Sequence, residues 1–401
     1  MSLPARIASR LRLPVIGAPL FIVSNPDLVI AQCLSGVIGS FPSLNARPAE
    51  KLEEWLIRIT ETLAAYDEAH PDAPSAPFAV NQIVHKTNDR LAHDLELCVK
   101  YKVPVVITSL GARRDVNDAI HSYGGIVLHD IININFAKKA LDKGADGLIA
   151  VAAGAGGHAG TTSPFALIAE IRAFFDGPLA LSGAIATGAG ILAAEAAGAD
   201  VAYIGSAFIA TEEANAAEAY KQSIVNGAAA DIVYTNLFTG VHGNYLRASI
   251  EAAGMDPDAL PHSDPTRMNF SSGLAKAWRD IWGAGQGVGS VRAVVLQPPR
   301  GSRNGMRNMW RLGGGWGWRR KARKARKARK ARGSAPGPRW GCRPQTPFYL
   351  FRDRHRHGAR WPNSTTRKIG TEDSRRAALA TAAARRRGSR GRAPWSAKLL
   401  L

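Results

Sequence analysis

Cysteine is scarce in this chain of 401 residues, which contains only Cys33, Cys98 and Cys342. Three cysteines without a CxxC spacing cannot form a disulfide framework or a four-cysteine zinc site. The chain also lacks any apolar run of the roughly 18 residues needed to span a bilayer, and residues 1–13 lack the continuous apolar core of a secretory signal. We therefore expect a cytoplasmic protein with no membrane partner.

Acidic residues are nearly absent from the last quarter of the chain. Residues 291–401 contain 31 Lys or Arg but 3 Asp or Glu, whereas residues 1–290 contain 21 and 29. The basic character of the protein therefore belongs to this tail. Four KAR triplets occupy residues 321–332, and six of the nine tryptophans follow residue 309. We predict that residues 291–401 form a basic, low-complexity tail without a packed core.

Three hypotheses remain open for this tail. It is a disordered arm that binds nucleic acid non-specifically through its phosphates, or a localisation signal made of the same Lys/Arg cluster. Alternatively, it is translated in a shifted frame, because GC-rich coding DNA read out of register gives Arg-, Gly-, Pro- and Trp-rich sequence.

Short apolar runs alternate with helical stretches before residue 290. Helical spacing of leucine and isoleucine marks residues 47–66, and residues 137–143 lead into Gly144, a helix stop. Apolar strands separated by helices are typical of a parallel sheet that is buried on both faces. The eight runs are residues 13–18, 36–41, 77–81, 104–109, 125–129, 146–151, 178–182 and 200–205.

Eight such units favour a (β/α)8 TIM barrel. A doubly wound open sheet is the alternative, because a count of runs does not show that the sheet closes. After the eighth run, residues 213–225 are predicted to be helical, and residues 231–281 are too long to be an idle loop. We predict a barrel domain over residues 1–290. A helical insertion over residues 212–282 would cap one end of the barrel, and the chain after it would return toward the barrel mouth.

Small residues follow the seventh and eighth runs, where barrel enzymes often bind phosphate. The sequences are Ser182-Gly183-Ala184-Ile185 and Gly205-Ser206-Ala207. Glycine lets a backbone approach an anion closely, and the amides at a helix start bind it. We predict a mononucleotide phosphate site there, with tight turns as the alternative. No GxxxxGK[ST] motif is present, which disfavours a P-loop.

The sixth run is followed by a glycine-rich segment around His158. A histidine held among glycines at a strand end can reach a substrate, and its ordinary pKa suits proton transfer at neutral pH. The alternative is a helix-capping histidine. Asn81, His129 and Asp130 also end strands, where each is either a ligand contact or a solvated turn residue. No histidines lie at metal-ligand spacing, and we propose no metal site.

These motifs together resemble the nitronate monooxygenase family, formerly called 2-nitropropane dioxygenases, whose members are FMN-dependent (β/α)8 barrels. The resemblance covers about residues 12–290. It rests on five sequences: PVIGAP at the first strand, GGHAG around His158, SGAI at Ser182, YIGSAF at Tyr203, and the late stretch from DIVYTNLFTGVHGNYLR to AWRDIWGAGQGVGS.

The resemblance implies roles for individual residues. His158 would be the catalytic base or would orient the substrate. Gly17, Ala18 and Pro19 would line the flavin ring through their backbone, with Asn81 near the ring or its ribityl chain. The remaining implied FMN contacts are Gly157 beside the histidine, Ser182, Gly183, Ala184, Gly205 and Ser206 around the phosphate, and Gln286 closing over the flavin.

The sequence departs from the family pattern at three places. Leu20 stands where methionine is common, which changes the shape of the substrate pocket. Ala184 stands where a second glycine is common, and its methyl would crowd the phosphate. Gly154-Ala155 replaces Glu-Ala, and the resemblance ends after Ser290, where a final helix would cover the barrel.

The resemblance implies oxidation of alkyl nitronates, and of nitroalkanes, by FMN and O2 to a carbonyl compound and nitrite. The alternative within enzymes is an FMN-dependent NADH:quinone or enoyl-thioester oxidoreductase, because similar barrels share the phosphate loops. A third hypothesis is a nucleic-acid-associated protein that binds through its tail.

Overall fold

The computed structural model describes residues 2–263 and 279–295. The predictions for residues 296–401, including the three hypotheses for the tail, lie outside the described residues. Within the described part, the eight predicted apolar runs all contain strands of one sheet. The strands are β1 (Val15–Gly17), β2 (Gly39–Pro42), β3 (Phe78–Ile83), β4 (Val105–Ser109), β5 (Ile126–Ile131), β6 (Gly147–Val151), β8 (Leu179–Ser182) and β9 (Val201–Ile204).

These eight strands form a closed parallel barrel. Their order is β1-β9-β8-β6-β5-β4-β3-β2, and every neighbouring pair is parallel. The ring is closed by a parallel bridge between Ile16 and Ile38, with hydrogen bonds of 2.8 and 3.1 Å between β1 and Ile38. The TIM barrel prediction is confirmed, and the open sheet is excluded.

Side chains along each strand alternate between the barrel interior and the helix layer, as a pleated strand requires. The interior is an apolar cluster from alternate strand positions, such as Ile16, Ala79 and Ile149. Leu3 and Ile7 join this cluster from the chain start, where α1 (Ala5–Ala8) fills the amino end of the barrel. The intervening residues pack outward against the helices.

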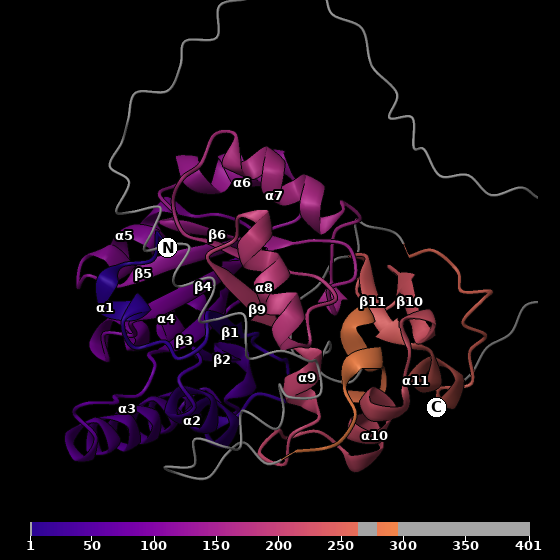
Figure 1. Cartoon of the computed structure of the whole chain (residues 1–401), viewed down its shortest axis with the longest axis horizontal. Helices are drawn as coiled ribbons and strands as arrows, with labels where there is room; N and C mark the ends of the chain where they lie inside the picture. Colours follow the sequence, from indigo (N-terminus) through magenta and orange to yellow (C-terminus); the bar gives the residue numbers. More distant parts are fainter. Residues whose placement is uncertain (1, 264–278, 296–401) are drawn as a thin grey trace, which may run out of the picture. The chain divides into compact units, whose positions relative to one another are not determined.

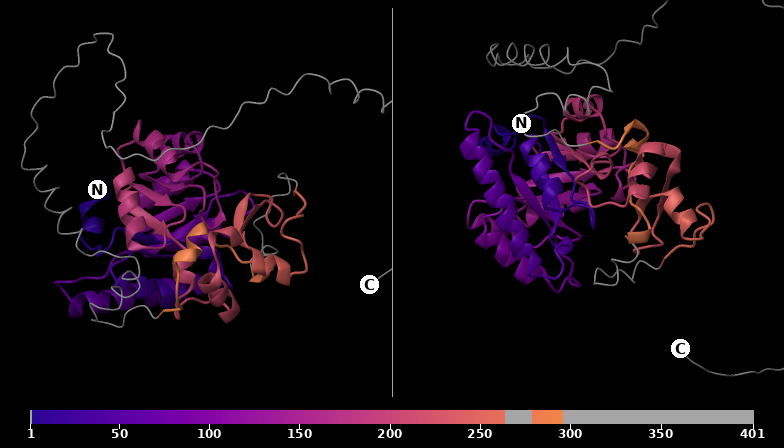
Figure 2. Two further views of the ribbon diagram at one scale, coloured as in Figure 1. Left: turned by 45° about the vertical axis from the view of Figure 1, so that its right-hand side comes forward. Right: turned by 90° about the horizontal axis from the view of Figure 1, so that it is seen from below.

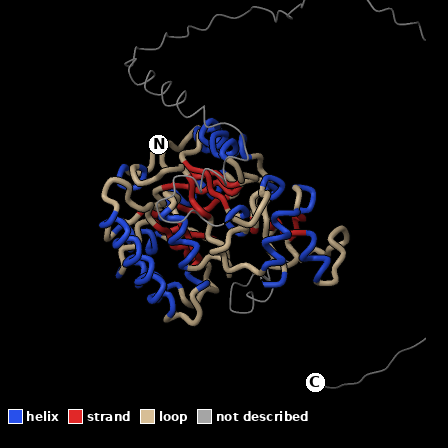
Figure 3. Tube along the Cα trace, turned by 60° about the horizontal axis from the view of Figure 1, so that its bottom comes forward, coloured by secondary structure: helices blue, strands red, loops and turns tan. Residues whose placement is uncertain are grey.

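Helices surround the strands in Figures 1 and 3. Their ends follow local sequence signals: Asn133 caps α6 and Thr187 caps α8 through side-chain bonds to backbone N–H groups, and Gly198 ends α8 in a left-handed conformation. The helices are α2 (Pro26–Leu34), α3 (Lys51–Ala69), α4 (Leu91–Lys100), α5 (Arg114–His121), α6 (Ile134–Asp142), α7 (Pro164–Arg172), α8 (Gly188–Ala197) and α9 (Ser206–Ile209).

The insertion is not purely helical, which corrects the prediction. It contains α10 (Glu218–Asn226) and α11 (Arg247–Ala252), but also the antiparallel strands β10 (Ile232–Thr235) and β11 (Gly243–Leu246). The β-branched and aromatic residues of β10 favour a strand. The insertion lies beside the barrel in both views of Figure 2.

The insertion is joined to the barrel through a third strand. Strand β11 also pairs with β7 (Gly157–His158), a short strand in the glycine-rich segment after β6. After the insertion the chain returns through η4 (Gln286–Ser290). Val295 then bridges Thr211, and Val291 is buried in the core, so the first residues after 290 still contact the barrel. Across the described ranges, no helix has the length and hydrophobicity to cross a bilayer.

Candidate active site

A cavity of about 980 Å³ lies at the carboxyl ends of the barrel strands. Its floor follows from the strand alternation, because seven of the eight strands contribute the residue two positions after one that fills the barrel interior. Ile16, Ala79 and Ile149 lie in the interior, for example, and Ala18, Asn81 and Val151 line the cavity. The same rule places Ser109, Asp130, Ser182 and Tyr203 in the lining.

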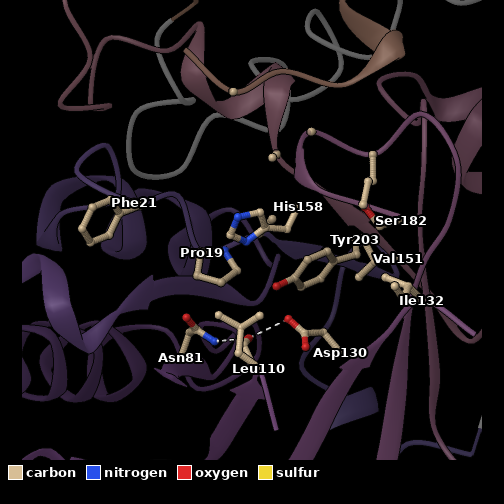
Figure 4. Close-up of a pocket in the computed structure, with 18 of the residues that line it drawn as sticks. Pro19, Phe21, Asn81, Leu110, Asp130, Ile132, Val151, His158, Ser182 and Tyr203 are labelled. Carbon is tan, nitrogen blue, oxygen red and sulfur yellow. Dashed lines mark hydrogen bonds between the residues drawn. The ribbon is translucent and has the colours of Figure 1, made fainter. Parts of the chain in front are cut away.

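Most of the residues predicted from sequence line this one cavity. They come from five different segments: Ala18 and Pro19, Asn81, Gly157 and His158, Ser182 to Ala184, and Gly205 and Ser206. Figure 4 shows Pro19, Asn81, His158, Ser182 and Tyr203 around the same space. The chain therefore brings together ten of the twelve predicted site residues.

Gly17 and Gln286 are not among the lining residues. The carbonyl of Gly17 accepts a hydrogen bond from the Ser40 hydroxyl, and a side chain at this glycine would collide with Gln32. Gly17 is thus required by packing beneath the cavity. Gln286 is exposed and lies in the chain between two lining residues, Gly285 and Gly287, and its backbone N–H donates to the Gly154 carbonyl at 2.9 Å.

The loops predicted to bind phosphate are held together by backbone contacts. The carbonyl of Gly154 accepts hydrogen bonds from the N–H groups of Ala184, at 3.1 Å, and Gln286. Gly183 has φ +138°, and a Cβ there would lie 2.7 Å from the Ala153 carbonyl oxygen. The Ser206 hydroxyl accepts from the N–H of Gly285 at 2.9 Å. These contacts fix a cradle of small residues at one end of the cavity.

Ala184 is strained at this cradle. It has φ +53°, in the left-handed region that favours glycine. Its N–H donates to the Gly154 carbonyl, so this hydrogen-bond donor is already used within the protein. Ala184 nevertheless lines the cavity, and its methyl occupies space that a glycine would leave open.

His158 enters the cavity from β7. Its ring contacts the insertion, because Nε2 lies 2.8 Å from the Thr239 hydroxyl oxygen. Burial lowers the pKa of His158 from 6.5 to about 4, because low-polarity surroundings disfavour the charged ring. The imidazole is therefore neutral at pH 7.

A polar chain crosses the floor of the cavity. The Asn81 side-chain nitrogen donates to the Ile107 carbonyl at 3.1 Å and to the Ser109 hydroxyl at 2.8 Å. Ser109 in turn donates to an Asp130 carboxylate oxygen at 2.6 Å. Since both amide hydrogens of Asn81 are used within the protein, its side chain can offer a ligand only an acceptor, not the donor and acceptor pair expected from sequence.

Asp130 is a buried carboxyl group in this floor. Burial raises its pKa from 3.8 to about 6, against the opposing effect of the Ser109 hydrogen bond. The Tyr203 hydroxyl is close enough to sense the charge of Asp130, and burial holds the pKa of this tyrosine well above 10. His129 also lines the cavity, with its Nδ1 2.6 Å from the Thr108 hydroxyl oxygen.

The sequence analysis missed Ser109, Tyr203 and Thr239 as site residues. The first two could have been found by counting two positions from the interior residue of each strand. No comparable signal marks Thr239, because its contact with His158 spans 81 positions. Within residues 2–263 and 279–295, no cluster of His, Cys, Asp and Glu has a metal-binding arrangement.

The nitronate monooxygenase family model matches residues 57–279, more than half of the chain. The chain belongs to the nitronate monooxygenase family. As a member of this family it is a flavin-dependent oxidoreductase, and family membership supports nitro compounds as the general class of substrate.

Curated relatives of this family member are similar over most of the barrel. A nitronate monooxygenase of Paraburkholderia phytofirmans is 27% identical over 292 residues, which cover 61% of this chain and 76% of the relative. A Rhodococcus jostii protein, (3aS,4S,5R,7aS)-5-hydroxy-7a-methyl-1-oxo-octahydro-1H-indene-4-carboxyl-CoA dehydrogenase, is 24% identical over 237 residues, covering 59% and 63%.

Solved structures support the fold of this family member. A nitroalkane oxidase from Streptomyces ansochromogenes gives a TM-score of 0.61 at 24% identity, covering 81% of this chain and 99% of that one. FabK from Thermotoga maritima gives 0.60 at 21% identity, covering 80% and 98%.

The cavity fits a flavin. About 980 Å³ lies at the upper end of the range of roughly 300–1,000 Å³ found for cofactor and small-molecule sites, which leaves room for a small substrate. The backbone cradle of Gly183 and Gly205 lies at the two strands where barrel enzymes bind phosphate. The floor presents the Asn81 oxygen and the Asp130 carboxyl as acceptors for ring or ribityl donors.

Replacing Asp130 by asparagine should stabilise the protein at alkaline pH. The raised pKa means that the folded carboxyl binds its proton more tightly than the unfolded one, so stability falls as pH rises from about 4 through 6. Asparagine carries no charge at any pH and can still accept the Ser109 hydrogen bond. We expect the gain in melting temperature of Asp130→Asn over the parent to be larger at pH 8 than at pH 4.5.

A matched control is Asp72→Asn, which removes an exposed carboxyl. Its effect on melting temperature should be small at both pH values. An Asp130→Asn gain that is equal at pH 4.5 and pH 8 would show that the carboxyl does not resist ionisation.

Replacing Ala184 by glycine should leave the protein as stable or slightly more stable. The left-handed backbone costs an alanine about 1–2 kcal/mol, while glycine loses about 0.5–1 kcal/mol through the greater freedom of the unfolded chain. We expect a net gain between zero and about 1.5 kcal/mol, measured by urea unfolding. Ala193→Gly, at an exposed position inside α8, should instead lose about 1 kcal/mol, and a similar loss at position 184 would contradict the strain.

Proposed function

We propose that this protein oxidises alkyl nitronates with bound FMN and O2, giving a carbonyl compound and nitrite, and that it also accepts nitroalkanes. The observation that carries the proposal is a neutral histidine, His158, in the same cavity as a cradle of small residues after β8 and β9. Membership of the nitronate monooxygenase family supports it independently.

In this proposal the flavin supplies the redox chemistry when it is bound. Gly183, Gly205 and Ser206 would hold the phosphate. Ala18 and Pro19 would contact the ring through their backbone, and Asn81 would accept a hydrogen bond from the cofactor. The remaining part of the cavity, beside His158, would hold the substrate.

His158 would act as a general base on nitroalkanes. A neutral imidazole can remove the α-proton of a nitroalkane, which makes the nitronate that is then oxidised. An alkyl nitronate added as substrate has already lost this proton and does not need the base. The low pKa of His158 means that the base stays available until the pH falls to about 4.

An absorbance spectrum of the purified full-length protein tests the proposal directly. We expect flavin bands, release of FMN on denaturation, and a change in those bands when propionate 3-nitronate is added without oxygen. Nitrite should appear when oxygen is admitted. The proposal would be contradicted by a protein that binds no flavin, or by flavin bands that do not change when the nitronate is added.

Replacing His158 by asparagine should separate the two kinds of substrate. General base catalysis usually contributes about 10²- to 10⁴-fold, so nitroalkane turnover should fall by about that factor while nitronate turnover changes little. Nitrite release from 2-nitropropane and from its nitronate measures both, at matched flavin content. Equal losses on both substrates would contradict the base role.

A second function is favoured by one observation. The R. jostii relative is named as a carboxyl-CoA dehydrogenase, which agrees with an FMN-dependent oxidoreductase that uses NADH and reduces quinones or enoyl thioesters. Rapid bleaching of the flavin by NADH without oxygen would favour this function, and lack of bleaching would favour the nitronate oxidation.

A further inference from the structure

Arg47 brings a positive charge to the cavity without an acidic partner. It follows β2, lines the cavity and is exposed, so it lies where the cavity opens to solvent. Its Nε donates to the Leu44 carbonyl at 2.9 Å. Across residues 2–263 and 279–295, no carboxylate forms an ion pair with its guanidinium group. The terminal N–H groups of Arg47 can therefore bind a ligand.

A second arginine makes this charge less favourable. Partial burial and the nearby charge of Arg90 lower the pKa of Arg47 from its ordinary value, although an arginine stays protonated at neutral pH. Arg90 is paired with the buried Asp94 at 3.0 Å and donates to the Ala46 carbonyl at 2.6 Å. The carboxylate of Asp94 is thus already used by Arg90. An anion bound beside Arg47 would relieve the repulsion between the two arginines.

Asn45 ties the loop of Arg47 to the loop that follows β1. Its side-chain nitrogen donates to the carbonyls of Leu20 and Ser24 at 2.9 and 2.8 Å, and its side-chain oxygen accepts from the Ile22 N–H at 2.9 Å. Ile22 has φ +68°, a left-handed conformation that is unfavourable for a branched side chain. These hydrogen bonds hold the strained turn and fix the two loops to each other.

Phe21 lies in this strained turn and lines the cavity, where Figure 4 shows it with Pro19 and His158. The guanidinium carbon of Arg47 lies 5.2 Å from the centre of the Phe21 ring, which is within the range of a cation–π interaction. This contact restrains the guanidinium without using any of its N–H groups. The charge at the cavity mouth is therefore held in place and still able to donate hydrogen bonds.

Arg47 and His158 lie on opposite sides of the cavity. Strands β2 and β6 are four strands apart in the closed ring of eight, so the loops that follow them lie across the mouth from each other. Eight strands about 4.8 Å apart and tilted by about 36° make a barrel roughly 15 Å across. A ligand that contacts both side chains must therefore be extended, with its polar groups at its two ends.

We propose that Arg47 is a specificity-determining residue that binds an anionic group, a carboxylate or a phosphate, at the end of the substrate away from its nitro carbon. A guanidinium group binds either anion through two parallel hydrogen bonds. Apolar lining residues such as Leu44 and Leu110 would contact the alkyl chain between the two ends. The identity of the reacting group rests on the proposed function, but the anion site does not.

Two lysines also line the cavity, on a different side. Lys139 lies on α6 and Lys143 directly follows it, with Asp142 between them. Helix α6 follows β5, which is the neighbour of β6 in the sheet. These lysines therefore lie nearer the strand that leads to His158 than the strand opposite it. They are the cations that the experiment has to separate from Arg47.

Binding of non-reacting ligands tests the anion site on the full-length, flavin-loaded protein. Hexanoate, hexyl phosphate and 1-hexanol share one alkyl chain and differ in the end group, and titration calorimetry measures their dissociation constants. We expect the anions to bind the parent about 5- to 20-fold more tightly than the alcohol, because a bidentate charged pair is strong but this one is open to water. The anion that loses more affinity in Arg47→Met identifies the preferred group.

The variants decide whether Arg47 causes this preference. Arg47→Met keeps the length of the side chain and should bring the anions and the alcohol to similar affinity. Arg47→Lys keeps the charge without the fork of N–H groups and should retain part of the preference. A parent that binds all three ligands equally, or an Arg47→Met protein that keeps the full preference, would overturn the proposal.

Turnover supplies the second readout. The nitronates of 6-nitrohexanoate and 1-nitrohexane differ only in the end group, and nitrite release measures both. Arg47→Met should raise KM for the carboxylate by about 5- to 20-fold, with kcat and the values for the uncharged chain little changed. Lys138→Met, at an exposed position of α6 outside the lining, is the control and should change neither. Equal effects of Arg47→Met on both substrates, or the same selective effect in Lys143→Met, would overturn the role of Arg47.

Failure of the proposed function would look different. In that case the parent would release no nitrite from either nitronate, while calorimetry would still report the preference for anions and its loss in Arg47→Met. Nitrite release without any preference for a charged end group would instead overturn the inference about Arg47 and leave the proposed function standing.

Discussion

The closed ring of eight parallel strands is the constraint on which the rest of the structure depends. Closure directs alternate side chains toward the axis, and the last inward position of each strand then has to face the cavity instead of the core. Asn81, Asp130 and Tyr203 reach the cavity for this reason, since they follow apolar interior residues by two positions on their own strands. A slip of one residue in the register would turn these groups toward the helices.

The barrel alone does not make the site, because its histidine lies beyond the strand ends. His158 follows β6 by seven residues, in a segment whose glycines could adopt many conformations. The pairing of this segment with β11 removes that freedom, and the Thr239 contact orients the ring. The barrel therefore supplies the cradle of small residues and the cavity floor, while the insertion sets the position of His158. This division explains why a long insertion between β9 and the returning Gly283–Ser290 stretch belongs to the site.

The sequence predicted local features well and remote contacts poorly. Apolar runs bounded by turn residues were enough to place all eight strands, and the glycine-rich loops and strand ends were enough to identify ten residues of the cavity lining. The insertion was predicted to be helical, whereas it contains β10 and β11. The β-branched run of β10 is short and lies in a segment interrupted by glycines and prolines, so it was not recognised as a strand. Helix α10 begins five residues later than predicted, because Asn215 bonds to the backbone of Val23 and Ile22.

The directions of hydrogen bonds in the site could not be predicted from the sequence either. The amide of Asn81 could have faced a ligand with either end, and only its contacts with Ile107 and Ser109 show that both hydrogens are used. The N–H of Ala184, in a loop predicted to bind phosphate, is bonded to the Gly154 carbonyl. These hydrogen bonds depend on partners from other segments of the chain. The spacing of residues within one segment does not show which distant residues lie nearby in space.

Two titratable groups of the cavity, His158 and Asp130, have pKa values shifted in opposite directions by the same cause. Burial lowers the pKa of His158 to about 4 and raises that of Asp130 to about 6, because both groups are more stable uncharged in surroundings of low polarity. Burial therefore favours the neutral imidazole, which agrees with the proposed role of His158 as a general base on nitroalkanes.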